Sequence, residues 1–374
     1  MRAGDGVTER ALSRLERYVM LETPSGDGDR IRALIRVIAD DLQALGADVE
    51  VLDAGEAGAN LHARISGAEP ALEPLLLLAH IDTVWPAGTT AERPFRVNGD
   101  RAEGPGTYDM KAGLTLAIEA LAALRADGRK PARPLDLLVT CDEEVGSRTS
   151  RPHIERLALA SAGVLVFEPS IPGGAAKTAR KGIVDLRLSV QGRATHSGLE
   201  PQSGISAIEE LARQIPVMLG LADLAQGTTV NVGRVGGGSA TNVVAANAWA
   251  DVEARFWTAA EGERVLAALR ALQPHHPGAT LSWKQEGGRP PFERTPGVAA
   301  LYERARDAAA TIGFDLREGR AGGASDGSLT AGLGVPTLDG LGPDGGGAHA
   351  IDEHILISDI APRVALHATL LATL

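Results

Sequence analysis

Residues 74–83 read Pro-Leu-Leu-Leu-Leu-Ala-His-Ile-Asp-Thr, an uninterrupted apolar run that leads directly into a histidine and an aspartate. A short run that is apolar on both faces is typical of a strand buried inside a parallel sheet. Since side chains alternate between the two faces of a strand, His80 and Asp82 share one face. In open α/β sheets the functional site lies outside the carboxyl ends of the strands. We therefore expect a site at this strand end, although the two residues could also cap the next turn.

Further apolar runs alternate with segments of helical spacing on both sides of this strand. Strands alternating with helices predict an α/β layer with a mostly parallel sheet. The expected strands are 48–52, 61–65, 135–140, 164–167 and 335–338, and the expected helices are 8–20, 29–45, 110–124, 297–312 and 358–373.

The pattern changes near Lys181. Residues 183–191 and 247–257 alternate apolar and polar side chains, with a helix-like segment at 206–219 between them. Such alternation is typical of a sheet with one solvated face. The Gly- and Pro-rich segment 285–291 is expected to link back to the first part. We expect a discontinuous catalytic domain (1–180 and 290–374) that is interrupted by a small α+β domain (181–289).

Composition narrows the functional class. A chain of 374 residues exceeds the size at which one core usually keeps growing, which favours two domains. The net charge of −11 argues against a nucleic-acid partner. The apolar runs are too short to span a bilayer, no secretory signal is visible, and the single Cys141 cannot form an intramolecular disulfide. We expect a cytoplasmic protein without a membrane partner.

Four more segments offer candidate ligands, most of them after a predicted strand. A Gly/Pro-rich loop at 104–108 delivers Asp109 to a helix start, and residues 141–146 read Cys-Asp-Glu-Glu-Val-Gly after the strand 135–140. Glu168 follows the strand 164–167, and His349 lies in a Gly-rich loop. Singly, each has an ordinary alternative, since aspartates often cap helices and acidic runs usually mark solvated turns.

Their coincidence at strand ends favours a metal site. Crowded carboxylates after a buried strand are costly unless a cation or a proton offsets them. Nitrogen and oxygen ligands suit Zn²⁺, and Co²⁺ or Mn²⁺ are also acceptable. One shared carboxylate can bridge two ions roughly 3.5–4 Å apart, as in aminopeptidases. The expected ligand set is two histidines and three carboxylates from these segments.

These motifs, in this order over nearly the whole chain, resemble the M20 metallopeptidase family. Within the group of glutamate carboxypeptidases, aminoacylases and acetylornithine deacetylases, the resemblance is closest to the glutamate carboxypeptidase branch. The resemblance implies a zinc-exopeptidase-like catalytic domain with an inserted lid and dimerisation domain, and hence a homodimer. It also implies that Asp109 bridges two Zn²⁺ ions. His80 and Glu168 would complete one site, and Glu144 and His349 the other.

The resemblance further implies that Glu143 is the general base and that Asp82 orients His80. These roles agree with the chemistry, because a dinuclear centre lowers the pKa of a bridging water, whose proton Glu143 could accept and later return to the leaving amine. An Asp82 that accepts the free N–H of His80 would fix its tautomer.

The inserted domain contributes residues that resemble substrate-binding positions of the family. His196, in Ala-Thr-His-Ser-Gly, resembles a lid histidine that reaches the site of the neighbouring subunit. Asn242, Arg255 and Arg289 resemble positions that contact the carboxylate end of the substrate, and an arginine fork suits a carboxylate. Ordinary surface residues are the alternative for all four.

The implied activity is hydrolysis of an amide bond next to a free carboxylate, with a carboxypeptidase that releases glutamate as the leading form. An N-acyl-amino-acid deacylase and a dipeptidase stay open. Residues 323–327, Gly-Ala-Ser-Asp-Gly, also fit a nucleophile elbow, which would use Ser325, Asp339 or Asp352, and His349. A nucleotide-binding loop at 236–239 is weaker, because it lacks the lysine of a P-loop.

Overall fold

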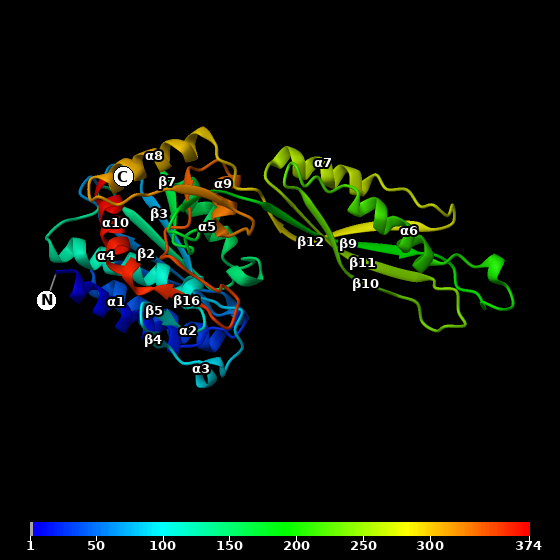
Figure 1. The fold of residues 1–374 in the computed structure, drawn as a ribbon, viewed down its shortest axis with the longest axis horizontal. Coiled ribbons are helices and arrows are strands. Elements are labelled where there is room, and N and C mark those ends of the chain that lie inside the picture. The colour runs from blue at the N-terminus through cyan, green and yellow to red at the C-terminus, as the bar shows by residue number, and fades with distance from the viewer. Residues whose placement is uncertain (1–2) are drawn as a thin grey trace. The chain divides into compact units, whose positions relative to one another are not determined.

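A computed structural model describes residues 3–374, which form two compact units (Figure 1). The first unit comprises the described residues up to Ala179, Glu293–Ala321 and Ser325–Leu374. The second comprises Arg180–Phe292 and Gly322–Ala324.

A six-stranded mixed sheet forms the centre of the first unit. Its spatial order is β1 (Asp48–Asp53), β2 (Ala59–Ile65), β6 (Leu135–Thr140), β3 (Leu75–His80), β7 (Gly163–Val166) and β14 (Thr337–Leu338). Strands β6, β3, β7 and β14 pair in parallel, whereas β2 is antiparallel to both of its neighbours. The predicted α/β fold with a mostly parallel sheet is thus confirmed, and every residue of β3 is buried.

Helices cover both faces of this sheet. The larger core packs α1 (Ala3–Met20), α2 (Gly28–Ala44), α4 (Ala112–Ala126), α8 (Pro296–Ala310) and α10 (Ile360–Thr373) against one face, and α5 (Arg151–Leu159) and α9 (Asp326–Gly332) cover the other. Leu75 and Leu77 of β3 belong to the first core and Leu76 and Leu78 to the second, so β3 is apolar on both sides. Each fully buried leucine contributes about 1.5–3 kcal/mol to stability.

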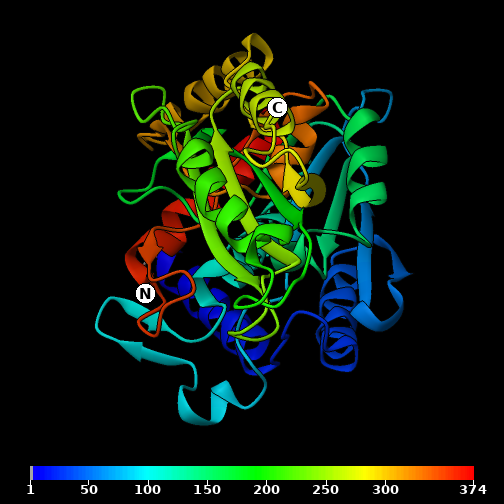
Figure 2. The ribbon, with the colours of Figure 1, turned by 90° about the vertical axis from the view of Figure 1, so that its right-hand side faces the viewer.

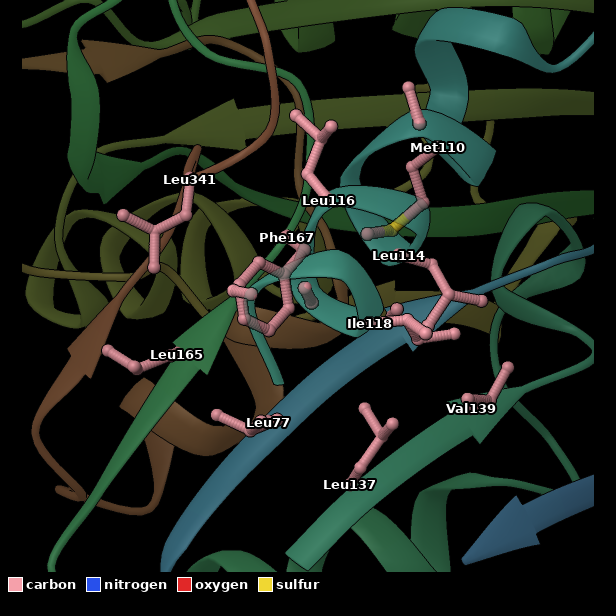
Figure 3. Close-up of a cluster of buried hydrophobic side chains, with 14 of the residues drawn as sticks. Leu77, Met110, Leu114, Leu116, Ile118, Leu137, Val139, Leu165, Phe167 and Leu341 are labelled. Carbon is pink, nitrogen blue, oxygen red and sulfur yellow. The ribbon is translucent and has the colours of Figure 1, made fainter. Parts of the chain in front are cut away.

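Helix α4 is apolar around most of its circumference, as expected of a helix enclosed by protein. Figure 3 shows the centre of the larger core, where α4 meets the strands that end at the candidate site. The side chains that meet there are Leu77, Leu114, Ile118, Leu137, Val139 and Leu165.

Short strands hold the loops around this core. A second sheet has the order β15 (Gly345–Gly346), β16 (His354–Leu356), β5 (Arg101–Glu103) and β4 (Arg96–Asn98), and β8 (Ala176–Arg180) pairs with β13 (Glu318–Ala321). One-turn helical segments lie at Gly55–Ala57, Glu143–Val145, Pro201–Ser203 and Ile357–Asp359, with α3 at Thr89–Glu92 and a wider turn at Thr107–Lys111. Because β16 pairs with β5, the loop after β15 lies beside the loop that precedes α4.

The second unit is an antiparallel sheet with two helices on one face (Figure 2). Its order is β10 (Thr229–Gly237), β11 (Asn247–Phe256), β9 (Gly182–Gln191) and β12 (Thr280–Arg289), and the helices are α6 (Ala207–Leu219) and α7 (Ala259–Arg270). Burial alternates along β9 and β11, as the sequence predicts for a sheet covered on one side.

The prediction that residues 285–291 form a linking loop is wrong for most of this segment. Strand β12 continues to Arg289 and pairs with β9 over that length. The pairing register shifts between Gln285 and Gly287, and Gly288 has a φ of 144°, which favours glycine. The glycines therefore serve a β-bulge rather than a loop. Among the helices formed by residues 3–374, none combines the length and apolar character needed to cross a membrane.

Candidate metal centre

Three neighbouring parallel strands deliver side chains to one edge of the sheet. His80 is the last residue of β3, Glu144 lies in the turn that follows β6, and Glu168 follows β7. Asp109 comes from the wide turn before α4, and His349 from the loop between β15 and β16. His349 has a φ of 61°, a backbone conformation that residues other than glycine rarely adopt. The edge is the one where α/β sheets carry their sites.

Asp109 lies between the two histidines. Its Oδ1 is 3.3 Å from Nε2 of His80, and its Oδ2 is 3.4 Å from Nε2 of His349. Nε2 of His80 is also 3.6 Å from Oε1 of Glu168, and Nε2 of His349 is 3.2 Å from Oε1 of Glu144. Two clusters therefore share the Asp109 carboxylate. They are grouped in the same way as the two zinc sites that the family resemblance implies.

These separations fit a metal site. Ligand atoms about 2.0–2.1 Å from a tetrahedral zinc ion lie about 3.3 Å apart, and the four distances between donors span 3.2–3.6 Å. Donor atoms of His80, Asp109 and Glu144 also lie within 4.8 Å of one another. The mixture of imidazole nitrogen and carboxylate oxygen is the ligand chemistry that zinc and related cations accept.

The electrostatics of the centre favour positive charge. Burial alone lowers the pKa of His80, but contacts with Asp109, Asp82 and Glu168 raise it well above its usual range. The hydrogen bond with Asp109 is the main reason why the pKa of His349 rises to about 9. Burial raises the pKa of Glu144 to about 7. The crowded carboxylates therefore need a cationic partner, which protons on the histidines or divalent ions can provide.

Asp82 is completely buried at the base of this centre. Nδ1 of His80 lies 3.0 Å from the backbone carbonyl oxygen of Asp82 and 3.5 Å from its carboxylate. The carboxylate instead accepts the backbone N–H groups of Glu143, at 3.0 Å, and of Glu144, at 3.2 Å. Asp82 thus adjoins His80, as the sequence suggested, and in addition fixes the turn that carries the two glutamates.

The three consecutive acids after β6 have different environments. Asp142 is buried, and its carboxylate accepts hydrogen bonds from the backbone N–H of Thr149 and the hydroxyl of Ser150, both at 2.6 Å. Glu143 is partly exposed and close enough to His80 to raise the pKa of that histidine. The triplet therefore divides into a turn-forming residue, a partly exposed candidate base and a candidate ligand.

Two further buried carboxylates hold this region. Asp326 accepts hydrogen bonds from the hydroxyls of Thr140 and Ser147, on either side of the acidic turn. Glu353 accepts the backbone N–H of Asp109 at 3.0 Å. Sequence reasoning missed Glu353, whose only local signal is an acidic residue four positions after His349. The sequence left the role of Asp326 open: segment 322–326 resembles a family loop near the site, and Asp326 begins α9.

The four candidate substrate-binding residues all lie in the second unit, in two pairs. His196 and Asn242 are exposed, and the N–H of Ser197 donates to the carbonyl oxygen of Asn242 at 3.0 Å. Arg255 and Arg289 both pair with Ile183, near the first residue of β9, whereas the other pair lies beyond its last residue. Ile183 and Gln191, near the two ends of β9, are eight positions apart, which corresponds to roughly 27 Å along a strand. The second unit alone therefore does not bring the four together.

The nucleophile-elbow hypothesis for Ser325 is wrong. The hydroxyl of Ser325 is fully buried, donates to Oδ2 of Asp339 at 2.7 Å and accepts the N–H of Gly327 as the cap of α9. The imidazole Nε2 of His349 instead faces Asp109 and Glu144. The nucleotide-binding loop considered at 236–239 is not a loop in its first half, because Gly236 and Gly237 are the last two residues of strand β10.

The chain is similar to several known proteins. Residues 76–373 match the sequence profile of the peptidase family M20/M25/M40. Carboxypeptidase G2 of Pseudomonas sp. (strain RS-16) is 31% identical over 373 residues, covering 97% of this chain and 89% of that protein. Succinyl-diaminopimelate desuccinylase of Delftia acidovorans is 28% identical, covering 94% and 95%. The crystal structure of aminopeptidase PepT from Bacillus cereus has the same fold, with a TM-score of 0.79, 23% identity and 98% coverage of each chain.

Proposed function

We propose that this chain, which belongs to the peptidase family M20/M25/M40 and is therefore a hydrolase of peptide or amide bonds, works with two zinc ions on an amide next to a free carboxylate. The observation that carries the proposal is the position of Asp109, whose two carboxylate oxygens face different histidines. Each histidine has a further carboxylate beside it, so two adjacent ions could each find nitrogen and oxygen ligands.

His80, Asp109 and Glu168 would hold one ion, and Glu144, His349 and the shared Asp109 the other. When bound, such a pair of ions supplies Lewis acidity that polarises a carbonyl group and makes water more acidic. Glu143 would accept the proton of the attacking water and return it to the nitrogen of the leaving amine. Its partial exposure, beside His80 and next to Glu144, suits a base that must reach the substrate.

The leading substrate class is a peptide or amide whose C-terminal amino acid, such as glutamate, is released. Similarity to a carboxypeptidase at 31% identity supports this choice. Arg255 and Arg289, on one end of one sheet, are the candidate partners of the free carboxylate. An N-acyl-amino-acid deacylase is the second candidate, because desuccinylases are similar to this chain at 28% identity.

We also propose a homodimer through the second unit. His196 is exposed at the end of the sheet opposite the two arginines, which suits a residue that serves the site of a partner subunit. An active and strictly monomeric preparation would contradict this part of the proposal.

The two adjacent glutamates provide a matched test of the metal and base roles. Metal content would be measured by mass spectrometry, together with hydrolysis of N-acyl amino acids and of α- and γ-glutamyl amides. We expect about two zinc ions per chain. Glu143→Ala should abolish hydrolysis and keep the metal, whereas Glu144→Ala should lose metal. A wild-type protein without metal, whose activity is indifferent to chelators, would overturn the proposal.

A further inference from the structure

Glu353 is a carboxylate buried beside the candidate centre, with 2% of its surface exposed. Its Oε1 accepts the backbone N–H groups of Tyr108, at 2.9 Å, and Asp109, at 3.0 Å. Its Oε2 accepts the backbone N–H of Gly106, at 2.9 Å, and the indole N–H of Trp85, at 2.8 Å. Each oxygen therefore has two donors, and three of the four donors belong to the turn that carries Asp109.

The same carboxylate connects segments that are far apart in the sequence. Trp85 follows β3, and Glu353 lies four residues after His349 on the loop between β15 and β16. The backbone carbonyl of Glu353 also accepts the N–H of Gly104 at 3.3 Å. The guanidinium of Arg93 lies 4.0 Å from the centre of the Trp85 ring and donates to the carbonyl of Ile351 at 3.0 Å. The contacts thus hold the Asp109 turn against the His349 loop.

The chemistry of these contacts requires a group that only accepts hydrogen bonds. Buried N–H groups without an acceptor are costly, and so is a buried carboxylate without donors. An ionised glutamate has two acceptor oxygens, whereas a glutamine has one oxygen and an NH₂ group that donates. In Glu353→Gln, two of the four donors would therefore face another donor.

We propose that Glu353 is a positioning residue of the metal centre: it fixes the backbone of Asp109 so that the two oxygens of that residue face His80 and His349. The inference rests on the proposed dinuclear function, which it deepens. A purely structural role would lower stability without changing the affinity for zinc, so the two roles can be separated by measurement.

Glu210, in the second unit, offers a matched control. It is also 2% exposed, and it accepts the N–H groups of His275, at 3.0 Å, and His276, at 2.9 Å, and the side-chain amide of Gln214 at 2.7 Å. Glu210→Gln therefore disturbs a comparable buried carboxylate in the other unit. Its melting temperature would report the loss of such contacts alone.

The experiment measures zinc affinity by competition with a chelator, and thermal unfolding, for the wild type, Glu353→Gln and Glu210→Gln. We expect Glu353→Gln to bind zinc about 10–100-fold more weakly, while Glu210→Gln keeps wild-type affinity. Unchanged affinity in a folded Glu353→Gln, or an equal loss in Glu210→Gln, overturns the inference. If Glu353→Gln does not fold, Trp85→Phe decides, because it removes one donor: weaker zinc binding supports the inference and unchanged binding overturns it. A wild type that binds no zinc would instead overturn the proposed function.

Discussion

Gly113, in the first turn of α4, lies against the backbone carbonyl of Phe167, so closely that a Cβ atom added to Gly113 would be 1.8 Å from the carbonyl oxygen. Asp109 precedes this turn of the helix and Glu168 follows Phe167. The close approach therefore sets the separation between two candidate ligands of the centre. Only glycine permits it, because any side chain would push the helix away from the end of β7.

Gly113→Ala should consequently lower both stability and zinc affinity. Forcing an extra carbon into a packed interior costs about 1–3 kcal/mol or more, and the displacement would widen the gap between Asp109 and Glu168. Thermal unfolding and zinc competition would measure the two effects. Gly6→Ala in α1 is the control, since its nearest neighbour is a flexible arginine end 3.7 Å away. Wild-type zinc affinity in Gly113→Ala would contradict this account.

Arg289→Gln should raise KM for substrates that carry a free carboxylate. A hydrogen bond to a charged group contributes about 1.5–3 kcal/mol, which corresponds to a rise of about 10–100-fold in KM. The measurement compares a substrate with its carboxamide analogue, for which the variant and the wild type should differ little. Arg187→Gln is the control on the same sheet, because it removes the same charge at a position four residues along β9 from Ile183, the common partner of Arg255 and Arg289. An equal rise in both variants would show that Arg289 has no specific role.

His367 should make stability depend on pH. Its imidazole is buried in α10, donates to the carbonyl of Leu341 at 2.7 Å and packs edge-on against Phe167, and burial lowers its pKa to about 4. The unfolded chain binds a proton below about pH 6.5, whereas the folded chain does not until about pH 4. Stability should therefore fall on acidification between these values, by on the order of 3 kcal/mol.

Melting temperatures between pH 7.5 and 5 would test this expectation. His367→Gln keeps a side-chain N–H for Leu341 but does not titrate, so its melting temperature should fall less steeply than that of the wild type. Loss of a bound metal at low pH would affect both proteins equally. His276→Gln, at an exposed position, controls for the loss of any histidine. Parallel slopes for the wild type and His367→Gln would show that this imidazole is not responsible.

The sequence predicted the parts of the fold that depend on long, regular patterns. The apolar run before His80 indicated the central strand because burial on both faces excludes polar residues there. Strands of two residues, such as Gly345–Gly346, carry no period, and the glycines of β12 resemble a loop until the bulge is seen. Ser325 fitted a catalytic pattern locally, yet tertiary packing buries it against Asp339.

The candidate site was predictable where each ligand follows a recognisable strand or motif. What the sequence could not provide were the contacts that orient those ligands, since they join segments hundreds of residues apart. Glu353 and Trp85 are 268 positions apart, and no local pattern connects them. The same holds for the hydroxyl of Thr140 and Asp326.

The hydrogen bond between Trp85 and Glu353 has an optical consequence. The chain has four tryptophans, and Trp249, Trp257 and Trp283 all belong to the second unit. Trp85 is thus the single indole of the first unit, which contains the candidate metal centre, and its N–H donates to the carboxylate that also accepts the N–H of Asp109. Replacing the other three by phenylalanine would leave fluorescence from Trp85 alone, so a change in its emission on addition of zinc would report metal binding without an added dye.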